Sequence, residues 1–198
     1  MTLRIIFLAL LVLLVSGCRT TPGDAASRSG HLEQAADLYR RGAEQGDADA
    51  ALKLGLLIDG VSDGRKDFGS AGSWFVKACG LGNVVGCHNA GVKFEYGQSG
   101  LDKNYEQARV YYSLAAKRGY MQSQYNLGSL YANGYFTDEV EGLKWLFAAQ
   151  TNARNCLPQA LCKWILEDPP GHVAKLIAGM SPEQVKSAAS QAAALAGK

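Results

Sequence analysis

Glycine recurs at a fixed period through the middle of this 198-residue chain. Gly55, Gly91 and Gly128 lie 36 and 37 residues apart, and each stands inside a segment of similar sequence. Self-similarity at such a period is typical of solenoids, in which each repeat buries its apolar face against the next. Two further series keep the period, namely Gly46, Gly82 and Gly119 between the segments, and Gly60, Gly97 and Gly134 at their ends.

The repeated segments are of two types, and both have helical periodicity. The first type carries apolar residues four positions apart, as at Leu54 and Ile58. The second type carries a bulky pair, such as Trp74 and Phe75, with small residues four positions later. These spacings place the apolar side chains on one face of a helix. An interior glycine costs a helix about 1 kcal/mol relative to alanine. Its repetition in the first type therefore predicts the close approach of a bulky ring.

The alternation of the two types resembles the Sel1-like repeat, a relative of the tetratricopeptide repeat. Residues 123–134 follow the first half of that motif almost completely, and residues 104–119 follow the second half. Gly142 departs from the motif where alanine is usual, and Ile58 departs where an aromatic residue is usual. The resemblance implies an all-α fold, a short right-handed α-solenoid of Sel1-like helix-turn-helix repeats with C-terminal capping helices. We assign residues 30–150 to the repeats.

Residues 151–198 drift from the repeat pattern and are expected to form the capping helices. Residues 157–166 could form one more helix of the first type, with Pro158 in its first turn. Ser181 and Gln184 form a capping-box pattern, which predicts the start of a last, alanine-rich helix.

Residues 1–17 predict an export signal. Arg4 precedes an apolar run over residues 5–15, which is too short for a bilayer-spanning helix of about 20 residues. The run ends in Val-Ser-Gly-Cys at residues 15–18, which resembles the bacterial lipoprotein signal. That resemblance implies cleavage before Cys18 and a diacylglyceryl group on its sulfur. An ordinary secretory signal with a chance cysteine is the alternative.

Residues 18–29 are polar and small, and are expected to form a flexible tether from lipidated Cys18. The expected location is the bacterial cell envelope, with the protein facing the periplasm. Arg19 follows the anchor, whereas enteric lipoproteins retained in the inner membrane tend to carry aspartate there. The resemblance thus favours the outer membrane over the inner one.

Four further cysteines are candidates for disulfides, which export permits. Seven residues separate Cys79 from Cys87, so that two antiparallel helices could face each other across the turn, as in cysteine-bridged Sel1-like repeats. Cys156 and Cys162 would be too far apart on one continuous helix, and can pair only if the chain turns near Pro158. Metal binding is the competing interpretation, but the close Cys-x-x-Cys pairs of zinc sites are missing.

Composition and motifs argue against catalysis. The formal net charge of +2 excludes a strongly basic nucleic-acid binder. No His-Glu-x-x-His, Gly-x-Ser-x-Gly or paired catalytic carboxylates occur. Cys87 beside His88 looks like a nucleophile beside a base, but neighbours on a helix point in different directions. We therefore expect no enzyme, no cofactor and no metal ion. The aromatic residues at repeat positions are assigned to the core: Trp74, Tyr111, Tyr112, Tyr125, Tyr131 and Trp145.

The remaining candidate is a surface for a partner protein. Helices of the first type are expected to line the concave side of the solenoid. Residues that flank their apolar stripe recur at matching positions and could form a column that binds the partner, with plain solvated surface as the alternative. The column consists of Lys53, Leu57, Asn89, Lys93, Asn126 and Leu130.

The resemblance also suggests a role. Small Sel1-repeat lipoproteins include immunity proteins that neutralise type VI secreted effectors, among them phospholipases, in the periplasm. We expect such a module, acting as a monomer that binds another protein and touches the membrane only through its lipid. The second hypothesis is a scaffold lipoprotein for envelope or exopolysaccharide assembly, and the third is a secreted hydrolase.

Overall fold

The computed structural model describes residues 21–60, 70–156 and 162–196. Within these ranges every regular element is a helix, and none is long and apolar enough to cross a membrane. The helices are α2 (Gly23–Arg28), α3 (Leu32–Glu44), α4 (Ala48–Gly60), α5 (Ala71–Gly80), α6 (Val84–Tyr96), α7 (Tyr105–Ala116), α8 (Met121–Ala132), α9 (Glu139–Arg154), α10 (Lys163–Glu167), α11 (His172–Ile177) and α12 (Pro182–Ala196).

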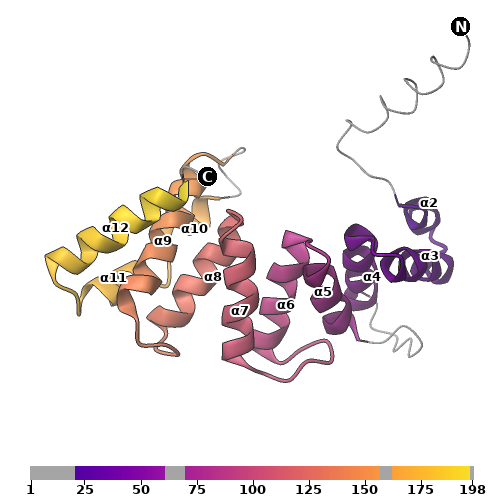
Figure 1. Ribbon diagram of the computed structural model, residues 1–198, viewed down its shortest axis with the longest axis horizontal. Helices are drawn as coiled ribbons and strands as arrows, with labels where there is room; N and C mark the ends of the chain where they lie inside the picture. Colours follow the sequence, from indigo (N-terminus) through magenta and orange to yellow (C-terminus); the bar gives the residue numbers. More distant parts are fainter. Residues whose placement is uncertain (1–20, 61–69, 157–161, 197–198) are drawn as a thin grey trace, which may run out of the picture.

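The helices stand side by side in an elongated row (Figure 1). Each helix from α3 to α9 packs on its neighbour in the chain, so the contacts are local. Helices α4, α6 and α8 contain the segments of the first type, and α3, α5, α7 and α9 those of the second. The all-α solenoid expected from the sequence is confirmed.

Capping residues and turn glycines set the helix boundaries. The side chains of Asn83, Asn104 and Asp138 accept hydrogen bonds from backbone N–H groups in the first turns of α6, α7 and α9. These bonds satisfy donors that the helices leave unpaired. Gly82 joins α5 to α6 at φ +96°, where a side chain would be strained. The tight turn brings the two helices together as an antiparallel pair.

The interior glycines let bulky side chains of the next helix reach the backbone. A Cβ atom on Gly55 would lie 2.7 Å from Cε1 of Phe75, and one on Gly91 would lie 2.6 Å from Cδ1 of Tyr112. The predicted approach of a ring is confirmed at these two positions. At Gly128 the close neighbour is instead the aliphatic Leu146, with Cγ at 2.6 Å. The repeat therefore conserves the tight fit and not the ring.

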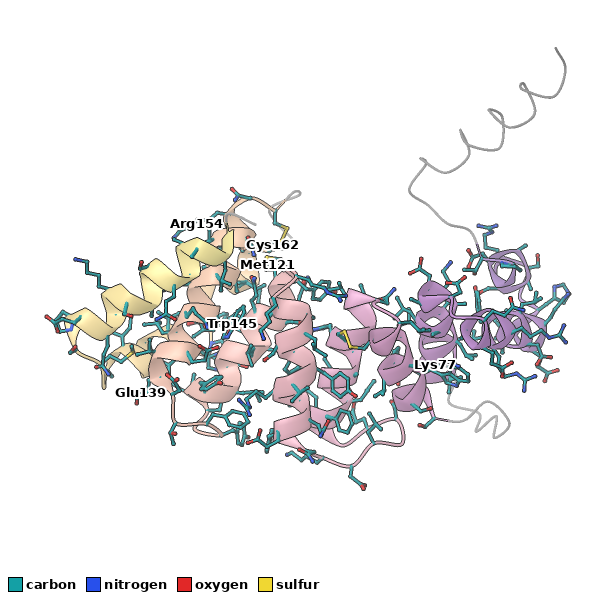
Figure 2. The ribbon with its side chains drawn as sticks, viewed as in Figure 1. Lys77, Met121, Glu139, Trp145, Arg154 and Cys162 are labelled. Atoms are coloured by element: carbon teal, nitrogen blue, oxygen red, sulfur yellow. A yellow bond between two sulfur atoms is a disulfide. The ribbon has the colours of Figure 1, made fainter. Side chains whose placement is uncertain are left out.

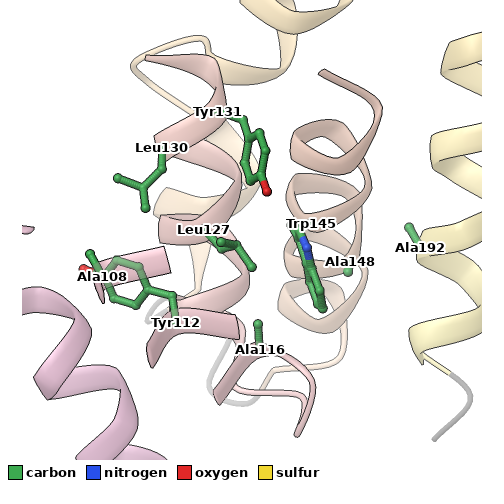
Figure 3. Packing of buried hydrophobic residues seen from close by; sticks show 9 residues of the cluster. All are labelled: Ala108, Tyr112, Ala116, Leu127, Leu130, Tyr131, Trp145, Ala148 and Ala192. Atoms are coloured by element: carbon green, nitrogen blue, oxygen red, sulfur yellow. The ribbon is translucent and has the colours of Figure 1, made fainter. Parts of the chain in front are cut away.

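The core runs through the row of helices and into the cap. Figure 3 shows one cluster of buried residues, with Tyr112 from α7, Leu127 from α8 and Trp145 from α9. Ala192 of α12 closes this cluster. Of the aromatic residues assigned to the core, Tyr112, Tyr125, Tyr131 and Trp145 are buried, whereas Trp74 and Tyr111 are half-buried.

Residues 21–29 do not form the predicted flexible tether, because α2 occupies residues 23–28. A Cβ atom on Gly23 would lie 2.5 Å from Cε1 of Tyr39, so α2 repeats the contact of the longer first-type helices. Asp24 accepts hydrogen bonds from the Tyr39 hydroxyl at 2.9 Å and from Lys53 at 2.7 Å. Polar composition suggested a linker, but these residues are held by tertiary contacts that the local sequence does not reveal.

The C-terminal segment forms the capping helices α10–α12, with α12 packed along α9. Of the helix considered over residues 157–166, α10 begins only at Lys163, and residues 157–161, Pro158 included, lie outside the described part. The capping box that opens α12 is formed, since Ser181 N donates to Gln184 Oε1 at 2.8 Å and Gln184 N donates to Ser181 Oγ at 3.3 Å.

Candidate protein-binding surface

The two lysines of the predicted binding column hold neighbouring repeats together. Lys53 on α4 pairs with Asp24 on α2, and Lys93 on α6 pairs with Asp59 on α4 at 2.8 Å. Burial opposes ionisation of Asp24, but bonds from Lys53 and Tyr39 outweigh it and hold the pKa of the carboxyl well below its usual range. Both lysines thus link one first-type helix to the preceding one.

The other members of the column are buried to different extents. Leu130 is fully buried in the core, so its assignment to a binding surface is wrong. Leu130 belongs to a buried cluster that also contains Ala108 and Tyr112 of α7, and α8 is packed between α7 and α9. Leu57, Asn89 and Asn126 are half-buried, and their role in binding stays a prediction.

The pair Cys87 and His88 is not arranged as a catalytic dyad. The structure joins Cys87 to Cys79 in a disulfide with a Cα–Cα distance of 4.4 Å. The ring of His88 lies between Tyr112 and Tyr120, and its Nδ1 is 2.9 Å from the buried Ser123 Oγ. Burial lowers the pKa of His88 to about 4. A neutral imidazole and an inaccessible hydroxyl serve packing here.

A polar cluster between α8, α10 and α11 was not anticipated from the sequence. The Tyr125 hydroxyl donates to Asp168 Oδ1 at 2.7 Å and lies 3.0 Å from His172 Nδ1. Burial lowers the pKa of His172, although the nearby Asp168 carboxylate opposes this shift. Asp168 ends α10 in the left-handed region, at φ +43°. The cluster is buried and fastens the capping helices to α8.

The second cysteine pair is joined as well. Cys156 and Cys162 form a disulfide with a Cα–Cα distance of 6.3 Å, between the end of α9 and the start of α10. Among the described residues no group of three or more His, Cys, Asp or Glu side chains is placed to hold a metal ion.

Sequence reasoning missed a group of tyrosines at the end of α6, at the start of α7 and in the α8–α9 loop. These parts of the backbone lie at the lower edge of the row in Figure 1. We call Tyr96, Tyr105 and Tyr135 the tyrosine edge. Tyr96 is 59% exposed and Tyr135 is 44% exposed, although both are large and aromatic. Tyr96 and Tyr135 stand next to Gly97 and Gly134, the glycines that end the first-type segments. That adjacency was the signal in the sequence.

The tyrosine edge is ordered by its own contacts. The Tyr105 hydroxyl donates to the Tyr135 hydroxyl at 2.9 Å, and their ring centroids stack 3.7 Å apart. The ammonium group of Lys103 lies 4.9 Å from the Tyr105 ring centroid. Its bond to the Tyr105 hydroxyl raises the pKa of Lys103.

Figure 2 shows the side chains along the whole row, with the two disulfides in yellow.

Comparison with known proteins assigns the repeats to a family. Residues 29–47, 48–83, 84–120 and 122–149 match the Sel1 repeat, and this chain belongs to the Sel1 repeat family. The class is therefore that of helical-repeat modules, whose extended surfaces bind other proteins.

The match to a curated relative covers only part of each of the two chains. Cytochrome c oxidase assembly factor 7 of Mus musculus is 32% identical over 111 residues, which is 52% of this chain and 48% of that protein. This chain thus spans about half the length of that relative.

Two crystal structures have similar folds. The first is c5321, a protective antigen of uropathogenic Escherichia coli strains with an SLR fold, at a TM-score of 0.65 and 28% identity, covering 84% of this chain and 33% of that one. The second is a Sel1 repeat protein from Oxalobacter formigenes, at a TM-score of 0.56 and 25% identity, covering 81% of this chain and 64% of that one.

Proposed function

We propose that this chain is a non-catalytic module of the bacterial envelope that binds another protein by shape. The observation that carries this proposal is the tyrosine edge, because ordered and exposed tyrosines are enriched in protein interfaces. The groups that could perform chemistry, by contrast, are used in disulfides and in buried packing.

The proposed lipid anchor at Cys18 would lie close to the folded helices. The backbone N–H of Thr21, three residues after the proposed anchor, donates to Asp24 at 2.8 Å and so ties this point of the chain to α2. Three residues span about 11 Å at most, whereas a free tether to residue 30 would span about 40 Å. A lipid on Cys18 would hold α2 at the membrane surface.

Mass spectrometry of the purified envelope protein tests the anchor. We expect a diacylglyceryl group on Cys18, and release of a Cys18→Ser variant from the membrane fraction. Wild-type protein in the soluble periplasmic fraction would contradict the anchor and leave protein binding untouched.

For the partner, we propose a type VI secreted effector of the phospholipase type, which the module would neutralise as an immunity protein. A steric inhibitor held at the membrane stands where a lipid-attacking enzyme acts. The test is a competition between a strain that lacks this gene and its parent with an active secretion system. We expect the deletion strain to be killed and to be rescued by the wild-type gene. Equal survival would overturn this role.

A scaffold for envelope assembly is the second candidate. The observation that favours it is the similarity to a protein named as an assembly factor. It predicts an envelope defect in the deletion strain grown alone, without any attacker, which the immunity role does not predict.

A further inference from the structure

The tyrosine edge is built to hold a cation. In the stacked pair, Tyr135 is exposed and Tyr105 is half-buried, and the ammonium group of Lys103 already lies over the Tyr105 ring. Next to it, the guanidinium of Arg109 lies 4.8 Å from the centroid of Phe136. Aromatic faces attract cations through their quadrupole, so this edge has the chemistry of a cation-binding surface.

The charges around the edge are acidic. Residues 93–109 and 131–144 carry six acidic side chains against four basic ones, whereas the whole chain has a net charge of +2. Salt bridges occupy three of the four basic groups, which are Lys93, Arg109 and Lys144. Lys103 is, within the described residues, the one basic group of this edge without a salt bridge.

Glu95 adds a carboxylate directly beside the rings. Its Oε2 accepts a hydrogen bond from the Tyr112 hydroxyl at 2.6 Å, and the group is half-buried. The carboxylate interacts electrostatically with Tyr96, Lys103, Tyr105 and Tyr135, so the five groups form one cluster. Tyr96 is the most exposed ring of this cluster.

We propose that the tyrosine edge, together with Glu95, binds an arginine-bearing basic segment of the partner protein. Arginine fits better than lysine because its planar guanidinium can stack on a tyrosine and still donate to a carboxylate. The proposal rests on the protein-binding function proposed above and specifies its surface.

Lys103 occupies this surface in the free protein. An exposed cation–π contact is weak, so an incoming guanidinium can displace the ammonium group. The proposal therefore makes two opposite predictions. Removing Lys103 should strengthen binding, and removing an exposed ring should weaken it.

The experiment measures binding of a fluorescent hexa-arginine peptide to the full mature chain by anisotropy, at low and at physiological salt. We expect Lys103→Ala to tighten binding about two- to fivefold, and the Tyr96→Ala/Tyr135→Ala double variant to weaken it by about fivefold or more. Lys117→Ala removes the same charge from the exposed end of α7 and should leave binding unchanged. Leu114→Ala, at 46% exposure, is the matched apolar control. Circular dichroism shows whether each variant is folded.

Three outcomes would overturn the proposal. Equal gains from Lys103→Ala and Lys117→Ala would mean that net charge alone attracts the peptide. Unchanged binding by the double tyrosine variant would exclude the rings. Tighter binding of hexalysine than of hexa-arginine would exclude guanidinium recognition. If these tests fail but the wild-type gene still rescues the deletion strain in the competition experiment, the partner binds elsewhere and the proposed function stands.

Discussion

The central repeats and the C-terminal cap solve the same packing problem in different ways. Between α4 and α9 one contact recurs, in which a bulky side chain of the second-type helix sits on a glycine of the first-type helix. The cap has short helices and no further repeat beyond it in the described chain. It is joined to α8 and α9 by the polar cluster of Tyr125, Asp168 and His172, and by the disulfide between Cys156 and Cys162.

This difference follows from the one-dimensional character of a solenoid. Each repeat contacts only its neighbours, so one tight contact can be copied along the array. In the described chain the last repeat is followed by the cap, and α12 packs along α9 on the face that a further copy would cover.

Acid should weaken the central repeats more than the cap. Burial lowers the pKa of His88 from 6.5 to about 4, so the unfolded chain binds more protons between these values. The contribution of neutral His88 to the free energy of unfolding is complete above pH 6.5 and is lost as the pH falls toward 4. The loss is about 2–3 kcal/mol, after allowance for the partial exposure of the His88 ring. Denaturant unfolding from pH 7.5 to 4 measures it, and His88→Gln should flatten the profile.

His172 is the internal control for that experiment. Its pKa is also lowered by burial, but Asp168 partly offsets the shift. His172→Gln should flatten the same profile less than His88→Gln does. A larger effect of the cap variant would show that the carboxylate does not provide this compensation.

Removing the disulfides should have different consequences in the two regions. Each closes a short loop and should contribute about 2–3 kcal/mol. For Cys79→Ala/Cys87→Ala we expect a lower midpoint of cooperative unfolding, because α5 and α6 keep their other contacts. For Cys156→Ala/Cys162→Ala we expect faster amide exchange in α10 and α11 at a smaller change in the midpoint. Identical exchange patterns would remove the distinction.

Adding a side chain at a glycine of the recurring contact should destabilise the protein. Gly91→Ala places a Cβ atom 2.6 Å from the Tyr112 ring and should cost about 1–3 kcal/mol of unfolding free energy. Gly60→Ala is the matched control, because nothing lies within 4 Å of its Cβ position. We expect the control to be neutral or to stabilise by up to about 1 kcal/mol. Equal losses in a thermal melt would mean that the glycines matter only as helix breakers.

The smallest predicted difference is between the contributions of the Tyr125 and Tyr112 hydroxyls to the free energy of unfolding. Tyr125→Phe leaves buried Asp168 and His172 without a shared partner and should cost about 1–2 kcal/mol. Tyr112→Phe frees the half-buried Glu95, which water can reach, and should cost about 0.5–1 kcal/mol. Urea unfolding of both variants compares them. A larger loss for Tyr112→Phe would show that the polar cluster does not hold the cap.

Sequence patterns predicted the repeated elements well and the surface poorly. The glycine period, the bulky pairs and the capping box at Ser181 identified the helix pairs and the opening of α12. The surface column failed at Leu130, because the outward positions of a helix depend on which neighbours cover it. The same limit applies to Lys53 and Lys93, whose acidic partners lie 29 and 34 residues away in the chain.

By itself the sequence determined the class of fold, since a helical period and a close-packed glycine are local properties that repeat with each copy. Only the tertiary structure decided that residues 23–28 form part of the solenoid, that Tyr125 of α8 meets Asp168 and His172 of the cap, and that Tyr105 stacks on Tyr135 at the tyrosine edge. Those arrangements depend on how distant helices dock, and docking is set by the combined shape of side chains that no local pattern brings together.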